Sequence, residues 1–288
     1  MNAGAYDRWM SVNHVAGKVV VVTGAGGGFG RLVCEKAAAL GAKVVGADIN
    51  RAGLDEMVAA VAAAGGTADG RVVDVTDLGQ MHALAAFAVE RHGALDVFIN
   101  NAGTMPLAFF SDHAAAAEAW SRCIDINIKG VLNGMIAAHD PMITQGRGHV
   151  INISSIYGNY PVVGAAVYGA TKAAVNVMSE SFRVETQGKI KVTIVKPTGV
   201  PATGLGASII NRDAVVGILG QNAASYGAKM GALGAGNAQA GELDPDDIRY
   251  AALAPGDIAE QVVNLFNQPW GISLGDITIR AAGDGYIL

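Results

Sequence analysis

The strongest constraint on the fold of this chain is a regular alternation between short β-branched runs and longer alanine-rich stretches. The short runs cover residues 18–22, 43–47, 71–75, 95–100, 149–153, 190–195 and 276–280. The longer stretches, which favour helices, cover residues 29–40, 51–64, 77–92, 113–143, 166–187 and 256–267. Apolar strands that alternate with helices predict a parallel sheet covered on both faces. Because such crossovers are right-handed, we expect one α/β domain of the doubly wound Rossmann type, with a parallel seven-stranded sheet.

The limits of this alternation predict the domain organisation. Residues 1–16 precede it and are expected to form an N-terminal extension, while residues 17–288 form the α/β domain. A Gly- and Ala-rich stretch at about 204–255 interrupts the alternation. Irregular segments of this length in compact domains are usually functional lids or partly disordered, and we expect an insertion within the domain that acts as a substrate loop.

Composition excludes several classes of protein. With 51% hydrophobic and 16% charged residues among 288, the chain is expected to be globular and not disordered. Its net charge of -5, without a Lys/Arg block, argues against nucleic acid and membrane partners. No run approaches the ~18 apolar residues of a membrane span. The two cysteines, Cys34 and Cys123, form no disulfide framework, and the histidines lack metal-ligand spacing. We therefore expect a cytoplasmic protein without a metal site.

A glycine-rich turn follows the first predicted strand and opens the first predicted helix. It runs Thr23-Gly24-Ala25-Gly26-Gly27-Gly28-Phe29-Gly30. Glycines adopt positive φ without strain and let a backbone approach a pyrophosphate, while a helix N-terminus offers free N–H groups. The strand before and the helix after strengthen a weak pattern, so we predict a dinucleotide phosphate loop that binds through Gly24, Gly28, Phe29 and Gly30.

An acid at the end of the second predicted strand bears on which dinucleotide binds. Asp48 lies twenty residues after Gly28, where a carboxylate accepts hydrogen bonds from an adenosine ribose and repels a 2′-phosphate. No Arg or Lys lies inside the glycine loop, and Arg51 comes three residues after Asp48. We therefore expect the cofactor to be NAD. The alternative is that Asp48 only caps the helix that begins near Arg51.

A tyrosine and a lysine lie near the start of the stretch 166–187. Tyr168 and Lys172 are four residues apart, which places both side chains on one helix face. A nearby ammonium stabilises a phenolate, and lowering a tyrosine pKa from roughly 10 to ~7 requires about 4 kcal/mol. Ser155, thirteen residues before Tyr168, ends the fifth predicted strand and can hold a substrate oxygen against the phenol. The residues alone do not distinguish Ser155 from its neighbour Ser154.

Together these motifs resemble the classical short-chain dehydrogenases/reductases. The glycine loop matches that family's glycine motif, and Asn100-Asn101-Ala102-Gly103 matches its Asn-Asn-Ala-Gly. Asn127 resembles its catalytic asparagine, Asp74-Val75 its adenine-contacting pair, and the thirteen-residue gap selects Ser155 as its serine. The matches span roughly residues 17 to 200, together with the final helix and strand.

The resemblance implies roles for these residues. Tyr168 is the expected general acid/base, Lys172 lowers its pKa and binds the nicotinamide ribose, Ser155 holds the carbonyl or alcohol oxygen, and Asn127 keeps a water that relays protons. It also implies that residues beyond the glycine loop and Asp48 bind the cofactor. These are Asp74, Val75, Asn101, Gly103, Tyr168, Lys172, Pro197 and Val200. A homo-oligomer, either a dimer or a tetramer, is the expected assembly.

Two positions depart from the family pattern. After Pro197 the family often has Gly and then a threonine that touches the carboxamide, but here Val200 is in register and Thr203 comes one place late. A role for Thr203 is therefore left open. The C-terminus also lacks the family's common Val-Asp-Gly-Gly, which leaves part of the expected subunit interface uncertain.

The predicted function is an NAD-dependent oxidoreductase that interconverts a secondary alcohol and a ketone. An NADP-dependent carbonyl reductase, an epimerase or dehydratase with permanently bound NAD, and a non-catalytic binding protein are the alternatives. The stretch 204–255 is apolar with few charges. Together with Phe109, Phe110, Tyr157, Tyr160 and Val162 it predicts a pocket for a bulky, uncharged small molecule. An ordinary core or a subunit contact is the alternative for these residues.

Overall fold

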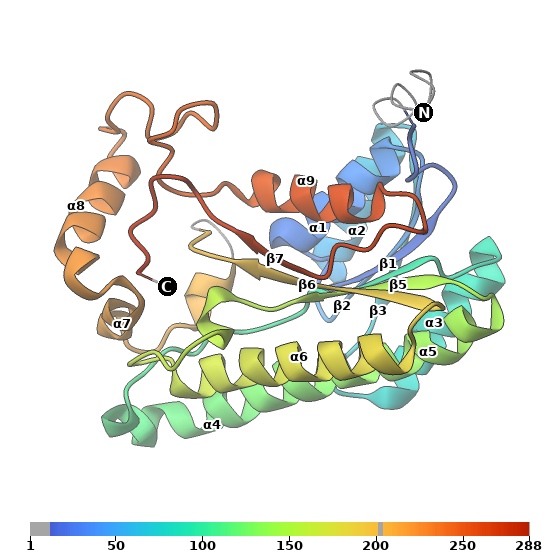
Figure 1. Ribbon diagram of the computed structural model, residues 1–288, viewed down its shortest axis with the longest axis horizontal. Helices are drawn as coiled ribbons and strands as arrows, with labels where there is room; N and C mark the ends of the chain where they lie inside the picture. Colours follow the sequence, from blue (N-terminus) through green and yellow to red (C-terminus); the bar gives the residue numbers. More distant parts are fainter. Residues whose placement is uncertain (1–11, 201–203, 288) are drawn as a thin grey trace, which may run out of the picture.

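A parallel sheet forms the centre of the molecule, as the sequence predicts. The computed structural model describes residues 12–200 and 204–287. Within them the sheet has seven strands in the order β3-β2-β1-β4-β5-β6-β7, all paired in parallel (Figure 1). The strands are β1 (Val19–Thr23), β2 (Lys43–Asp48), β3 (Thr67–Val72), β4 (Val97–Asn100), β5 (Gly148–Ile153), β6 (Ile190–Pro197) and β7 (Asp276–Ile279). The fold is a single Rossmann-like α/β domain, and the predicted fold class is confirmed.

The central strands are buried on both faces, which explains their continuous apolar sequence. Every residue of β1, β4 and β5 is buried. The edge strand β3 is mostly exposed or half-buried, so its apolar signal is weak. Its predicted position, 71–75, was therefore wrong: the strand pairs with β2 from Thr67 to Val72, and Asp74 and Val75 lie in the loop that follows.

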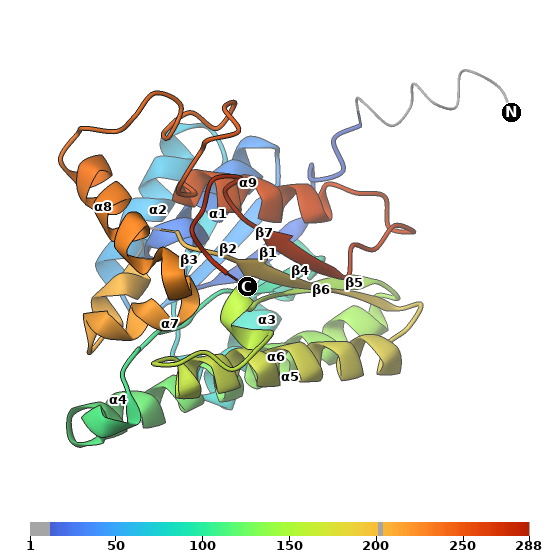
Figure 2. The ribbon, with the colours of Figure 1, turned by 60° about the vertical axis from the view of Figure 1, so that its left-hand side comes forward.

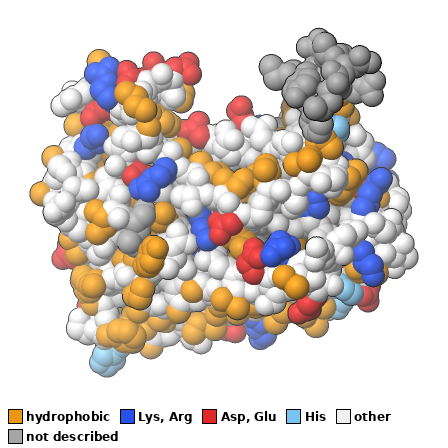
Figure 3. Space-filling view, viewed as in Figure 1, with side chains coloured by type: hydrophobic (Ala, Val, Ile, Leu, Met, Phe, Trp, Pro, Cys, Tyr) orange, Lys and Arg blue, Asp and Glu red, His pale blue; other side chains and the backbone are white. Residues whose placement is uncertain are grey.

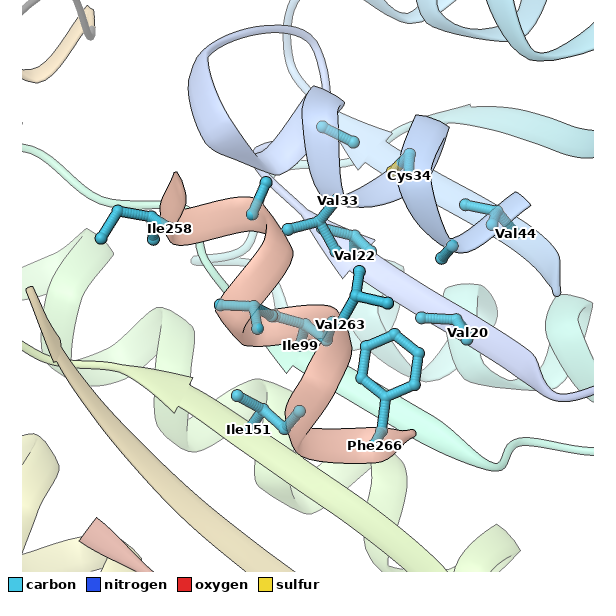
Figure 4. Close-up of a cluster of buried hydrophobic side chains, with 14 of the residues drawn as sticks. Val20, Val22, Val33, Cys34, Val44, Ile99, Ile151, Ile258, Val263 and Phe266 are labelled. Atoms are coloured by element: carbon cyan, nitrogen blue, oxygen red, sulfur yellow. The ribbon is translucent and has the colours of Figure 1, made fainter. Parts of the chain in front are cut away.

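Helices cover both faces of the sheet. One layer contains α1 (Gly28–Ala39), α2 (Arg51–Ala63) and α9 (Pro255–Phe266). The other contains α3 (Leu78–His92), α5 (Gly130–Thr144) and α6 (Ala166–Glu185), and α4 (His113–Ile124) extends this layer beyond the sheet (Figure 1). Figure 4 shows α9 directing Ile258, Val263 and Phe266 toward β1, β4 and β5. No helix among the described residues is long and apolar enough to span a membrane.

The stretch after β6 is built differently from the layers around the sheet. It contains the 3-10 turns η6 (Gly204–Ser208), η7 (Arg212–Val215) and η8 (Gly220–Asn222), and the helices α7 (Val216–Leu219) and α8 (Ala223–Gly234). Turns and extended chain then lead to α9. We call Gly204–Ala254 the cover, because Figures 1 and 2 place α7 and α8 beside the carboxyl ends of the strands. Its side chains Ala214, Ile218 and Leu219 pack with Leu107, Tyr157 and Tyr168.

Charged side chains are dispersed over the visible surface. On the face in Figure 3, Lys and Arg side chains lie in small groups among Asp and Glu, with no extended patch of one sign. The described residues contain no cluster of three or more His, Cys, Asp or Glu side chains that could hold a metal ion.

Candidate active site

A single cleft brings together most of the residues that the sequence predicts as functional. It has a volume of about 760 Å³ and lies along the carboxyl ends of the strands, between the sheet and the cover. Its walls include Gly24, Gly28, Phe29, Gly30, Asp48, Asp74, Val75, Asn101, Gly103, Ser155, Tyr168, Lys172, Pro197 and Val200. Asn127 is absent from the wall and lies fully buried behind it. Thr203, whose role the sequence left open, lies outside the described residues.

The glycine loop has the geometry that a phosphate site requires. Gly24 and Gly28 have φ of 68° and 54°, the left-handed region in which other residues are strained. A Cβ at Gly30 would overlap the carbonyl oxygen of Gly24, whereas Cβ atoms at Gly27 and Gly28 would meet open space. The loop is therefore tight toward the protein and open toward the cleft. The helix α1 starts at this loop, and its first backbone N–H groups lack partners within the helix. Such N–H groups bind anions, so the residues present fit a pyrophosphate.

Asn101 supports this loop from the neighbouring strand. Its side-chain amide donates to the carbonyl of Thr23 at 2.8 Å and to that of Gly24 at 3.2 Å. Its backbone N–H donates to the Thr23 hydroxyl at 3.0 Å. Asn101 thus links the ends of β1 and β4, and its amide group is occupied in holding the loop.

Asp48 ends β2 and faces the cleft. One carboxylate oxygen accepts from the Gly26 N–H and the other from the Asn50 N–H, both at 2.9 Å. A carboxylate has about four lone-pair positions, so both oxygens keep capacity for ribose hydroxyls. Asp48 is not the cap of α2, because Asn50 is the N-cap residue and its side chain accepts from Gly53 N.

The loop after β3 holds Asp74 and Val75, for which the resemblance predicts contacts with adenine. Asp74 accepts from both the backbone N–H and the hydroxyl of Thr76, so its carboxylate organises the loop. The Val75 carbonyl accepts from Asn133 of α5 at 2.9 Å. Both residues remain on the cleft wall, although they lie outside the strand in which the sequence placed them.

Tyr168, Lys172 and Ser155 meet at the inner end of the cleft. Tyr168 and Lys172 lie on the first turns of α6, with the Lys172 ammonium 5.7 Å from the centroid of the Tyr168 ring. The ammonium donates to the Ile153 carbonyl at the end of β5, at 2.8 Å. A hydrogen bond joins the Tyr168 phenol and the Ser155 hydroxyl. Phenol, hydroxyl and ammonium therefore come from two adjacent elements.

The hydrogen bonds of the two neighbouring serines distinguish them. The Ser154 hydroxyl donates toward Asn176 at 2.6 Å and toward the Lys172 carbonyl at 3.2 Å, so it is directed into α6. Ser155 lies at the N-cap of a short 3-10 turn, η5 (Ile156–Gly158), and accepts from Tyr157 N. Its hydroxyl is the one that reaches the phenol, which agrees with the choice that the family spacing made.

Burial shifts the pKa values of Tyr168 and Lys172. It raises the pKa of the Tyr168 phenol well above its ordinary value, and the hydrogen bond with Ser155 opposes that shift only in part. It lowers the pKa of the Lys172 ammonium to about 8. The expected lowering of the phenol pKa by Lys172 stays a prediction. The ammonium is bonded to a backbone carbonyl, and desolvation of the phenolate is the largest effect.

Asn127 lies in a π-helical turn, Asp125–Lys129, between α4 and α5. Such turns displace side chains from the helical register and are frequent at functional sites. The Asn127 side-chain oxygen accepts from Thr104 N at 3.0 Å, and its amide donates to the Thr104 carbonyl at 2.9 Å and toward Thr171 Oγ1 at 3.1 Å. Asn127 therefore ties the segment after β4 to α6, behind Tyr168 and Lys172.

Sequence reasoning missed several residues that build the site. Thr171 sits between Tyr168 and Lys172, and its hydroxyl donates to the Tyr168 carbonyl at 2.7 Å. Its place inside the Tyr-x-x-x-Lys motif was an available signal. Tyr286 also lines the cleft, but no pattern in the sequence links this C-terminal residue to it. Conversely, Tyr160 and Phe110 are 64% and 70% exposed and do not line the cleft, and neither do Phe109 and Val162, contrary to expectation.

The fold and cleft define a class of protein: a Rossmann-type oxidoreductase with a tyrosine–lysine pair beside a dinucleotide loop. A family model described as short chain dehydrogenase matches residues 18–214. The chain therefore belongs to the short-chain dehydrogenase family, whose members use a nicotinamide cofactor.

Relatives by sequence agree with this family. A 2,5-dichloro-2,5-cyclohexadiene-1,4-diol dehydrogenase of Sphingobium indicum is 36% identical over 189 residues, 65% of this chain and 75% of the relative. An uncharacterized oxidoreductase of Staphylococcus saprophyticus is 31% identical over 273 residues, 93% of this chain and 98% of the relative.

Solved structures agree as well. Levodione reductase superposes with a TM-score of 0.73 at 25% identity, covering 93% of this chain and 97% of that one. A metagenomic short-chain oxidoreductase in complex with NADP gives 0.69 at 27% identity, covering 93% and 98%. An NAD⁺-bound xylitol dehydrogenase, at 0.74 and 23% identity, covers 92% and 98% and supports the fold alone.

Proposed function

We propose that this chain is an NAD-dependent dehydrogenase that interconverts a secondary alcohol and a ketone. The observation that carries the proposal is the meeting of Tyr168, Ser155 and Lys172 at the inner end of a cleft that begins at a dinucleotide loop. The nicotinamide cofactor, when bound, donates or accepts the hydride. The chain's own side chains orient the substrate and transfer the proton.

The chain's own residues divide the proton chemistry. The Tyr168 phenol, neutral because it is buried, gives its proton to the carbonyl oxygen in reduction and recovers it in oxidation. Ser155, already within hydrogen-bond reach of that phenol, orients the same substrate oxygen. Lys172 contributes positive charge beside the ring and can hold the nicotinamide ribose. Asn127, fixed by Thr104 and Thr171, supports the path by which the proton is replaced.

The preference for NAD rests on Asp48. Its carboxylate lies on the cleft wall, and a 2′-phosphate beside it would bring two negative charges together. The cleft wall nearby is formed by Ile49 and Asn50, neither of which is basic. Solved relatives include complexes with NADP as well as NAD, so the preference is argued from this chain's carboxylate.

The proposed substrate is small, bulky in shape and uncharged. The cover contributes Leu205, Ile209, Val215 and Tyr226 to the cleft, none of which carries a charge. Met105 and Leu107 extend this apolar wall. The Sphingobium relative acts, by its name, on a cyclic diol, which fits a pocket of this kind.

We further propose a homo-oligomeric assembly, to be tested by light scattering of the purified protein.

The decisive experiment follows nicotinamide absorbance with a panel of alcohols and ketones, using NAD and NADP in parallel. With uncharged secondary alcohols, we expect one NAD from solution to be reduced for each alcohol molecule oxidised. A tightly bound cofactor that is never released or consumed would indicate an epimerase or dehydratase and overturn the proposal. Preference for small charged hydroxy acids would exclude the proposed substrate class.

A further inference from the structure

The C-terminal segment after β7 returns to the cleft. Figures 1 and 2 show it passing from β7 toward α7 and α8 and ending beside them. We call residues 281–287 the tail. The Ile287 N–H donates to the Ile218 carbonyl of α7 at 3.1 Å, and Asn222 donates to the Gly285 carbonyl at 3.0 Å. The tail is thus attached to the cover on one side.

A buried carboxylate attaches the tail to the sheet on the other side. Asp284 accepts from the Thr198 hydroxyl at 2.9 Å and from the Arg280 guanidinium at 3.0 Å. Its side chain is only 6% exposed. Thr198 directly follows β6, so this ion pair and hydrogen bond fix the tail where β6 leaves the sheet. Residues on both sides of Tyr286 are therefore held in place.

Tyr286 fills a space that a glycine leaves open. A Cβ at Gly199 would overlap the Tyr286 phenol, so only glycine admits the ring at this position. The ring packs edge-on against Tyr226 of α8, with centroids 5.7 Å apart and planes at 75°. Gly199, in the segment between Pro197 and Val200, thus has a structural role in this chain.

Both tyrosines of this pair line the cleft that also holds Tyr168. A hydrogen bond joins their hydroxyls, and burial raises the pKa of both phenols, so both stay neutral. Tyr157 packs edge-on against Tyr168, with ring centroids 5.5 Å apart, and belongs to the same apolar cluster as Tyr226 and Tyr286, so it connects the pair to the site. All four tyrosines line the same cleft. An aromatic wall therefore runs from the catalytic phenol to a second group of hydroxyls.

We propose that Tyr286 and Tyr226 form a second anchor that selects ring-shaped substrates bearing a second oxygen. This inference rests on the proposed function. The aromatic faces favour an alicyclic or aromatic ring, and the hydroxyl pair, which can both donate and accept, binds a second hydroxyl or carbonyl on it. The substrate class is then the cyclic diols and hydroxyketones, oxidised or reduced at the carbon beside Tyr168.

The test compares three substrates in four proteins. The substrates are a mixture of isomeric cyclohexanediols, cyclohexanol and an acyclic secondary alcohol; the proteins are the wild type, Tyr286→Phe, Tyr226→Phe and the control Tyr160→Phe. Removing one anchoring hydrogen bond is expected to lower kcat/KM for the diols about tenfold relative to cyclohexanol, mostly through KM. The control, whose ring is 64% exposed, is expected to change no ratio.

The outcomes separate this inference from the function beneath it. If the wild type oxidises the acyclic alcohol but neither tyrosine variant changes the diol-to-cyclohexanol ratio, the second anchor is wrong and the dehydrogenase remains. An equal loss for all three substrates would show a general disturbance of the fold and would also overturn the anchor. If the wild type oxidises no alcohol, the proposed function and the anchor fall together.

Discussion

The sheet and the cover, which enclose the same cleft from opposite sides, are built on different principles. Strands β1, β4 and β5 are wholly buried, and the helices around them contribute a continuous core. In the cover, α8 has no buried residue. The cover joins the rest of the molecule through a small cluster around Ile218, through hydrogen bonds to the tail, and through Tyr250 and Leu253, which belong to the core. In the proposed mechanism, the sheet side holds the cofactor loop and the catalytic group, while the cover and tail complete the substrate end. Because the chemistry is assigned to the densely packed side and the selectivity to the sparsely packed side, we expect substitutions to change substrate selectivity without changing the chemistry.

The largest effect should follow from a change on the sheet side. Tyr168→Phe removes the only atom that can pass a proton to the substrate oxygen in the proposed mechanism. We expect kcat to fall by about a thousandfold, within the range of general acid–base catalysis, because the ring and its packing remain. Steady-state kinetics and cofactor titration by fluorescence provide the measurement. Activity within about threefold of wild type would remove Tyr168 from the mechanism.

Substitutions of apolar residues should lower the stability of the protein more on the sheet side than in the cover. Phe266→Ala empties a fully buried ring position between α9 and the sheet and is expected to lower the free energy of unfolding by about 3–5 kcal/mol (Figure 4). Met230→Ala, on the half-buried face of α8, is expected to cost less than about 1 kcal/mol. Denaturant unfolding of both variants measures the contrast. Equal losses would mean that the cover is as tightly packed as the sheet.

The same contrast explains which parts of the molecule the sequence predicts. The glycine loop, Asp48 and the Tyr168–Lys172 spacing are local patterns, since each depends on residues within one strand–helix unit. Edge strand β3 was misplaced because its exposed residues carry little apolar signal. Tyr286 could not be predicted, because its place depends on Gly199 and Tyr226, contacts between segments far apart in the chain. The desolvation that raises the pKa of the Tyr168 phenol was also beyond reach, since spacing reveals charge but not burial.

Burial of Lys172 predicts a pH dependence of stability. Its folded pKa of about 8 lies below the ordinary 10.5, so between these values the unfolded chain binds more protons and stability rises with pH. Lys172→Met has no ammonium at this position, so its unfolding free energy does not rise with pH for this reason. The unfolding free energy of Lys172→Met minus that of the wild type should therefore fall by about 3 kcal/mol as the pH rises from 8 to 10.5. Lys36→Met, which removes an exposed ammonium, is the control, and parallel profiles for Lys172→Met and wild type would contradict the burial cost.

The smallest expected effect concerns the cofactor end and tests whether it can change without the cover. Asp48→Asn keeps one acceptor oxygen, enough for one of the two backbone N–H groups that Asp48 binds, and removes the charge that a 2′-phosphate would meet. Repulsion between such charges is worth about 1–4 kcal/mol at 4 Å, so the preference for NAD over NADP should fall about tenfold or more. Asp74→Asn is the matched control, since its carboxylate is bonded to Thr76. Because Asp48 lies outside the cover and tail, its variant should keep the wild-type order of substrates. A changed order would show that the two ends of the cleft are coupled, and an unchanged cofactor preference would assign NAD selection to other residues.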